Sequence, residues 1–191
     1  MSNYTAIADV GDILITLLRD NMGIPPDTIM LISPGEIEAN DNVRLSLFLY
    51  QVIENPYMKN QEMQRIDSAH LKYPSLTLEL YYMLTAHPAS GIPDRTERTR
   101  EEHGILGKAM RIIYDYSILD FSDYELKITL HPMSLDDMTK IWTTFQDRPF
   151  RPSACYLVTP VVIESTRDMR VKRVVEKKTA QEQIVPERGV E

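Results

Sequence analysis

Four histidines and one cysteine are the side chains with the widest chemical repertoire in this 191-residue chain. His70, His87, His103 and His131 fall in separate segments, without the short spacings that bring metal ligands together. The chain has no phosphate-binding glycine loop, no GxSxG elbow, and no HExxH or paired-cysteine motif. The residue types therefore favour surface or loop roles for the histidines over metal ligation.

The densest polar cluster is Glu101-Glu102-His103. Neighbouring residues on a helix point about 100° apart, which is a poor geometry for a shared acid–base site. We expect these carboxylates to lie near a helix amino terminus, where the helix dipole accounts for their charge. Cys155 is expected to be a buried small hydrophobe, because no nearby motif would lower its pKa. The sequence thus predicts no catalytic residues, no bound metal and no cofactor.

Composition places the chain among ordinary globular proteins of about one domain. Hydrophobic residues make up 43% and charged residues 26%. The longest apolar stretches, such as Leu45–Tyr50, are far shorter than the roughly 18 residues that a membrane span needs. The amino terminus lacks a secretory signal pattern, and a single cysteine is typical of a reducing compartment. A net charge of −7 argues against nucleic acid as a partner.

Charge is divided unevenly between a body and a tail. Residues 1–165 carry 14 Lys+Arg against 23 Asp+Glu, whereas residues 166–191 carry 7 against 5. We predict a folded domain over 1–165 and an extended arm over 166–191, which has too little apolar area to fold alone. The run at 170–175 is rich in β-branched residues, so it could add a strand to another protein's sheet edge. A solvated carboxy terminus is the equally weighted alternative.

Hydrophobic periodicity predicts an α+β domain with one mostly antiparallel sheet and helices packed on it. The first helix is expected over 3–21, and a second begins near Thr96 or Thr99 and runs to Tyr116. A third follows Ser134, whose spacing to Asp137 is typical of an amino-terminal cap, and continues to Phe145. The expected strands are 28–32, 43–53, 75–87, 124–130 and 153–163.

Two of these strands carry specific expectations. The strand at 43–53 is apolar on both sides, with Phe48, Tyr50 and Val52 on its second face, so it is either central or covered by a neighbouring subunit. The strand at 153–163 contains Pro160, which places it at or near a sheet edge. In the strand at 75–87, Thr77, Glu79 and Thr85 are expected to face outward. The segment 54–74 is expected to form a loop or flap.

The second helix carries an expected capping box and two glycines. Thr99 followed by Glu102 matches the box, and the buried stripe is expected to run from Ile105 to Tyr116. Gly104 and Gly107 each cost about 1 kcal/mol relative to alanine inside a helix. Their presence indicates close packing on the sheet or, alternatively, approach of the backbone to another chain.

An ordered set of motifs resembles the cap, or tail-terminator, proteins of contractile injection systems, the phage-tail-like particles that bacteria assemble and release. The resemblance covers about residues 5–165. Its motifs lie at 45–56 (LSLFLYQVIENP), 74–76 (PSL), 80–86 (LYYMLTA), 102–111 (EHGILGKAMR), 141–142 (IW) and 151–158 (RPSACYLV).

The resemblance implies a non-enzymatic cap with a tail-terminator fold. Such proteins form a homo-oligomeric, sixfold ring that ends the inner tube and anchors the last sheath layer at the end distal to the baseplate. It further implies assembly in the bacterial cytoplasm, followed by incorporation into a released particle. Tube and sheath proteins are the implied partners, with no nucleic acid and no membrane.

Within this reading, two sets of residues are expected to make contacts. The subunit interface would use Phe48, Tyr50, Val52, Gly104 and Gly107. The sheath-binding arm would use Val171, Lys172, Arg173, Val174, Val175 and Lys177.

Two alternatives to the cap remain. A neck or tail-completion adaptor of the phage type would share the fold class. An enzyme would use the 54–74 segment as a lid over a pocket in which Glu102 and His103 converge.

Overall fold

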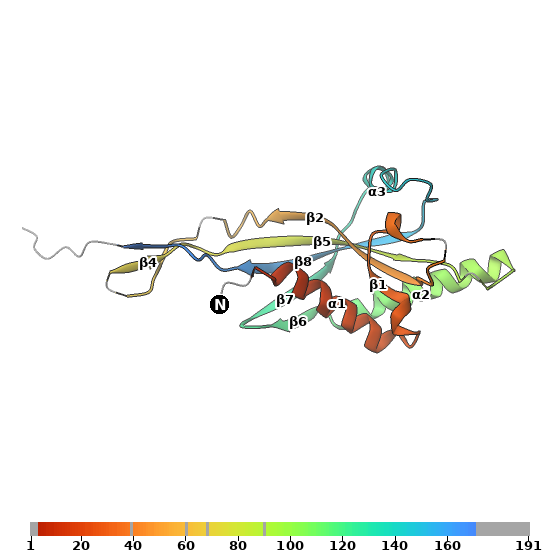
Figure 1. The fold of residues 1–191 in the computed structure, drawn as a ribbon, viewed down its shortest axis with the longest axis horizontal. Helices are drawn as coiled ribbons and strands as arrows, with labels where there is room; N and C mark the ends of the chain where they lie inside the picture. Colours follow the sequence, from red (N-terminus) through yellow and green to blue (C-terminus); the bar gives the residue numbers. More distant parts are fainter. Residues whose placement is uncertain (1–3, 39, 60, 68, 90, 171–191) are drawn as a thin grey trace, which may run out of the picture.

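The computed structural model describes residues 4–170 apart from 39, 60, 68 and 90, and shows an elongated α+β fold (Figure 1). The predicted fold class is therefore confirmed, with helices packed on a mostly antiparallel sheet. The elements are α1 (Ala6–Met22), the 3₁₀ helices η1 (Pro26–Thr28) and η2 (Pro34–Glu36), β1 (Ile29–Leu31), β2 (Leu45–Glu54), β3 (Gln64–Arg65), β4 (His70–Lys72), β5 (Leu76–Ala86), α2 (Arg95–Asp115), β6 (Ile118–Phe121), β7 (Tyr124–Leu130), α3 (Leu135–Trp142), β8 (Ser153–Ile163) and β9 (Asp168–Arg170).

The main sheet has six strands in the order β1-β2-β5-β8-β7-β6. All neighbours are antiparallel except β1 and β2, which run parallel. The prediction that Pro160 places its strand at or near an edge is wrong, because β8 lies inside the sheet, between β5 and β7. The proline is tolerated there because β7 pairs with β8 only as far as Thr159, so its missing N–H falls where that ladder has ended.

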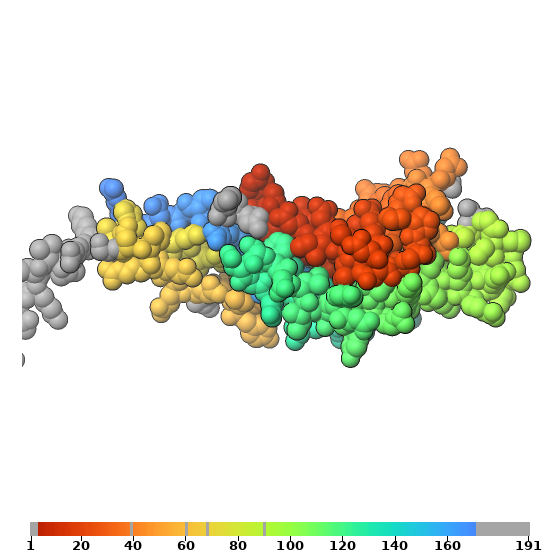
Figure 2. Space-filling view, turned by 90° about the horizontal axis from the view of Figure 1, so that it is seen from below, coloured from red at the N-terminus to blue at the C-terminus, as the bar shows by residue number. Residues whose placement is uncertain are grey.

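One face of this sheet carries the main core. The amphipathic helix α1 buries Val10, Leu14 and Leu18 against it, and ends at Gly23, which takes the left-handed conformation at φ 64°. Helix α2 covers the same face through Ile105, as Figure 2 shows from the side where α1 and α2 lie together. This packing confirms the first two helices as amphipathic elements.

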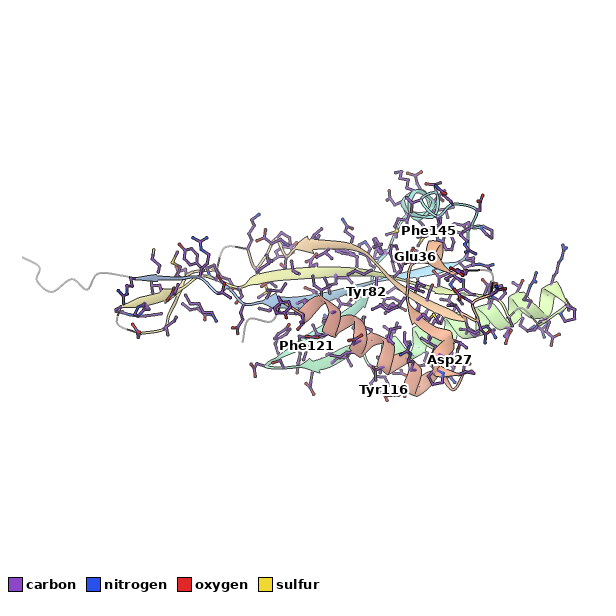
Figure 3. The ribbon with its side chains drawn as sticks, viewed as in Figure 1. Asp27, Glu36, Tyr82, Tyr116, Phe121 and Phe145 are labelled. Atoms are coloured by element: carbon purple, nitrogen blue, oxygen red, sulfur yellow. The ribbon has the colours of Figure 1, made fainter. Side chains whose placement is uncertain are left out.

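The opposite face is covered in part by α3. Met138, Trp142 and Phe145 pack there on Met83 and Cys155, so Phe145 and the main-core residue Phe121 lie on opposite sides of the sheet (Figure 3). The predicted cap is confirmed, since Ser134 Oγ accepts from the Asp137 N–H at 3.2 Å. The helix is shorter than expected and ends at Trp142. Leu135, in its first turn, is 72% exposed.

Because both faces are covered, β5 is buried almost throughout. The expectation that Thr77, Glu79 and Thr85 face outward to solvent is wrong, since all three are buried. The Glu79 carboxylate accepts a hydrogen bond from the Tyr81 hydroxyl at 2.9 Å, which offsets its burial. The alternation of apolar and polar residues along β5 could not show that α3 covers the second face of the sheet.

A bulge in β2 changes which residues share a face. The β2–β5 register shifts between Leu49 and Gln51, so Tyr50 is the extra residue. Residues that pair directly across two strands lie on the same face of the sheet. Phe48 pairs with Met83, which lies on the face covered by α3. Val52 pairs with Leu80, which belongs to the main core on the other face. The expectation that Val52 shares a face with Phe48 is therefore wrong.

The segment expected to be a loop or flap at 54–74 instead contains two strands. β3 pairs with β4, and β4 pairs with β9, giving a separate three-stranded sheet. This small sheet lies at one end of the molecule, beyond the long strands β5 and β8 (Figure 1). The expectation failed because β4 needs β9, whose residues are distant in the sequence.

The helix α2 begins at Arg95, next to Thr96, the earlier of the two expected starts. Asp94 caps it by accepting from the N–H of Thr96 at 2.7 Å, so the expected box of Thr99 and Glu102 is wrong. Tyr116 is 46% exposed and lies outside the buried stripe. The hairpin strand β6, which follows this helix, was not predicted.

Candidate functional site

The acidic cluster on α2 is tied to two arginines from other elements. Glu101 pairs with Arg44 at 2.9 Å, and Glu102, which is buried, pairs with Arg151 at 2.8 Å. These residues lie well inside α2, so ion pairs account for their charge and the expected role of the helix dipole is wrong. His103 is exposed beside a shallow hollow with Arg100, away from these pairs. The structure therefore does not bring Glu102 and His103 together.

The other candidate chemical groups are dispersed. His70 lies 2.9 Å from the Asp67 carboxylate, and His131 packs edge-on against Tyr81. Burial raises the pKa of the Cys155 thiol, which agrees with its predicted role as a small buried hydrophobe. Among the described residues no three His, Cys, Asp or Glu side chains are close enough together to hold a metal ion.

His87 follows the end of β5 and lies beside the start of β2. Its Nε2 lies 2.8 Å from the Ser46 hydroxyl, and burial lowers its pKa to about 4, with the positive charges of Arg151 and Arg148 acting in the same direction. A neutral imidazole with a polar partner is well suited to a structural role at the junction of β2 and β5.

The predicted interface glycines lie on an open surface of α2. A Cβ atom added at Gly104 or Gly107 would meet no atom of the described residues within 4 Å. The expectation that these glycines allow close packing of the helix on its own sheet is therefore wrong. The alternative, approach of another chain, remains a prediction, and the nearby Tyr114 is 80% exposed.

The three predicted interface residues on β2 do not form one surface. Phe48 and Tyr50 are half-buried against the apolar cluster between α3 and the sheet, here called the α3 cluster (Met83, Met138, Trp142, Phe145 and Cys155). The Phe48 ring contacts Phe145 edge-on at a centroid distance of 5.8 Å. Val52 lies on the opposite face and is 41% exposed. Any contact with a neighbouring subunit would therefore use Val52 on one side of the sheet and the rim of the α3 cluster on the other.

An open strand edge was missed by sequence reasoning. β1 pairs with β2 only over Leu45–Leu47, so within the described chain the outer edge of β2 has no partner strand from Phe48 to Glu54. Unpaired backbone groups on such an edge are a template for another strand. No sequence signal marks this edge, because it depends on the order of strands in the sheet.

The three-stranded sheet leads directly to the predicted arm. β9 pairs with β4 in the register His70 to Arg170, and the Arg167 guanidinium lies over the Tyr73 ring at 4.5 Å. The start of the 166–191 segment is thus held by its own chain. The predicted sheath-binding residues Val171, Lys172, Arg173, Val174, Val175 and Lys177 lie outside the described residues.

Two surfaces in the described part of the chain, residues 4–170 with four gaps, have no cover from the chain itself: the glycine positions of α2 and the open edge of β2. In this part of the chain, no helix has the combined length and apolar character required to cross a membrane.

Comparisons with known proteins agree with this picture. A structure of the sheath/tube terminator of an extracellular contractile injection system, PVC, in its extended state matches with a TM-score of 0.66 and 17% identity, covering 94% of this chain and 64% of that one. The tube-terminating cap of the anti-feeding prophage matches with a TM-score of 0.62 and 16% identity, covering 91% of this chain and 60% of that one. The chain thus spans 60–64% of the length of these two structures, which is less than two thirds.

A search of curated proteins gave no match. The model of the family described as the Pvc16 N-terminal domain matches residues 9–177, which is most of the chain. With the fold shared as well, this protein belongs to the Pvc16 N-terminal domain family.

Proposed function

We propose that this protein is a structural cap, which terminates the inner tube and anchors the last sheath layer at the distal end of a contractile injection particle. The observation that carries this proposal is the family match over residues 9–177. The fold supports it, because the two similar structures are a sheath/tube terminator and a tube-terminating cap. In this function the protein acts by shape and contact, without bond-making chemistry, as part of a particle that is released from the cell.

In this function the protein would act as a closed ring. The resemblance to cap proteins implies six subunits in that ring. A subunit of such a ring contacts two neighbours through two different surfaces. The exposed glycines of α2 and the open edge of β2 are two such surfaces on different elements. The helix surface would let a neighbour's backbone approach closely, and the strand edge would supply main-chain hydrogen bonds.

The arm would reach the sheath from the three-stranded sheet. β9 fixes where the arm leaves the body, and this point lies at the end of the molecule far from α2 (Figure 1). The β-branched residues Val171, Val174 and Val175 would pair with a strand edge of the sheath. The basic residues Lys172, Arg173 and Lys177 would complement an acidic sheath surface and set the approach.

The terminator function is tested on whole particles. Particles assembled with this chain are expected to have tubes of uniform length, and particles assembled without it are expected to have tubes of variable length and detached sheaths, as seen by negative-stain microscopy. Tubes of normal, fixed length without the chain would rule out the terminator function.

Truncation after Arg170 tests the arm. The shortened protein is expected to keep the thermal midpoint of the full chain and to bind tube ends, because β9 and the body are retained. Particles that carry it are expected to lose their last sheath layer, counted by electron microscopy.

Two variants separate the contribution of the valines of the arm from that of its basic residues. Replacing Val171, Val174 and Val175 by serine should abolish sheath attachment, because it weakens strand pairing. Replacing Lys172, Arg173 and Lys177 by glutamine should slow attachment and remove its salt dependence. A truncated protein that still retains a full sheath would disprove the function of the arm.

Substitution of the two exposed glycines separates folding from assembly. The double variant Gly104→Ala/Gly107→Ala is expected to stabilise the isolated subunit by about 1–2 kcal/mol, because alanine favours the helix and its methyl groups enter open space. Calorimetry should record a higher melting temperature. If a neighbour's backbone contacts these positions, Gly107→Leu will reduce ring formation measured by light scattering, whereas Thr16→Leu, on the exposed face of α1, will not. Equal ring formation by both leucine variants would exclude the glycines from the interface.

A further inference from the structure

A cavity of about 260 Å³ lies where four segments of the chain meet. These segments are the loop after η2, the end of β5, the start of α2 and the stretch between α3 and β8. They meet because β2 begins, β5 ends and β8 begins at the same end of the sheet, as the pairs Leu45–Ala86 and Thr85–Ser153 show. The cavity therefore lies at one end of the sheet, and loops between the elements form most of its wall.

Three arginines from two segments line this cavity. Arg98 comes from the first turns of α2, and Arg148 and Arg151 come from the stretch that precedes β8. Arg151 is held by the buried Glu102 carboxylate at 2.8 Å. Arg98 and Arg148 are half-buried, and neither has an ion-pair partner among the described residues. Half-buried guanidinium groups without a partner are poised to bind an anion.

The remaining lining fits an anion of modest charge. Glu38 and Asp41 are exposed at the rim, and Asp41 accepts from the Glu38 N–H at 2.7 Å. His87 contributes a ring whose Nε2 is already bonded to Ser46. The rim carboxylates oppose a group with two or more negative charges, which favours a singly charged carboxylate over a phosphate.

A second feature of the cavity wall is a hydrogen-bond donor without an acceptor. Trp142 lines the cavity and is 96% buried, and its indole N–H has no partner among the described residues. Buried donors are almost always satisfied, so this N–H needs an acceptor, which a water molecule or a ligand group can supply. This observation is independent of the charge of the arginines.

We propose that this cavity is a binding site for a carboxylate group presented by a partner protein, held by Arg98 and Arg148 beside Trp142. An acidic side chain or a carboxy-terminal carboxylate supplies the same chemistry, because both oxygens of either can accept from a guanidinium. Identification of the partner as a tube or sheath protein rests on the proposed function. The carboxylate chemistry does not rest on it, so the site can be tested on the isolated chain.

Titration of the ¹⁵N-labelled full chain tests the site, because Trp142 is the one tryptophan and gives one indole signal. The probes, at constant ionic strength, are acetyl-Ala-Glu-Ala-amide, its Gln counterpart, acetyl-Ala-Ala-Ala with a free carboxylate, and inorganic phosphate. We expect saturable shifts of the indole signal with the Glu peptide, the free-carboxylate peptide or both, and none with the Gln peptide. Which of the two binds more tightly identifies the source of the carboxylate.

Variants assign the binding to the named arginines. Arg148→Gln is expected to weaken binding about tenfold, since it removes a charge-assisted hydrogen bond. Arg98→Gln, on the surface of α2, repeats this test if the first variant folds poorly. Arg111→Gln, on an exposed part of the same helix, should leave affinity unchanged. Saturable shifts with the Gln peptide, no shift with either carboxylate-bearing peptide, tighter binding of phosphate, or unchanged affinity in both cavity variants would overturn the proposal.

Discussion

Replacement of Trp142 by alanine is expected to lower the free energy of unfolding by about 3–5 kcal/mol. The indole is buried, and its ring contacts Phe145 at a centroid distance of 5.3 Å and Phe150 at 5.7 Å. These rings and Met138 attach α3 to the second face of the sheet. Removing the largest member leaves a cavity that a short helix cannot close. Urea unfolding followed by far-ultraviolet circular dichroism measures the loss.

Leu135→Ala is the matched control for this prediction. Leu135 lies on the same helix but is 72% exposed, so its truncation is expected to change stability by no more than about 0.5 kcal/mol. A loss below about 1 kcal/mol in the Trp142 variant would contradict the view that α3 depends on this cluster.

Stability is expected to fall as the pH is lowered from 6.5 to about 4, and His87 is the cause of a large part of this loss. The pKa of this ring is about 4 in the folded chain and about 6.5 when unfolded, so between these values the unfolded chain binds a proton that the folded chain excludes. Unfolding is therefore favoured as the pH falls through this window. After a discount for partial exposure of the ring, the contribution is about 2–3 kcal/mol.

Comparison of wild type with His87→Asn isolates this contribution. Asp67, Asp137 and Glu164 also have lowered pKa values, and their stabilising effect is lost in acid, but they are present in both proteins. Denaturant unfolding at a series of pH values should give a flatter profile for the variant between pH 6.5 and 4. The exposed His103→Asn should keep the profile of the wild type. Parallel profiles for wild type and His87→Asn would show that His87 does not drive the loss.

Much of the local structure could be predicted from the residues alone. Leu14 and Leu18 define the buried stripe of α1, and Ser134 marks the start of α3 through its hydrogen bond to the Asp137 N–H. These features depend on neighbours in the chain, since helix periodicity and capping act over three or four residues. The same holds for the family, because its motifs are continuous stretches of sequence.

The candidate contact residues were predicted less well. Gly104 and Gly107 were correctly placed inside a helix, but only the structure shows that they face open space. Phe48 and Val52 were assigned to one face by strict alternation, and the bulge at Tyr50 places them on opposite faces. A single extra residue reverses the facing of every later side chain in a strand, and alternation gives no warning of it.

The sequence by itself determined the three helices, the long strands, the α+β class, the absence of catalytic motifs and the family. The tertiary structure alone decided the pairing of β4 with β9, whose partners His70 and Arg170 are 100 residues apart, and the open edge of β2. It also decided that Arg98 and Arg148 line one cavity. The physical reason is that helix and strand periodicity are local, whereas strand order and cavity walls depend on contacts between distant segments, which compete for the same faces and hydrogen bonds.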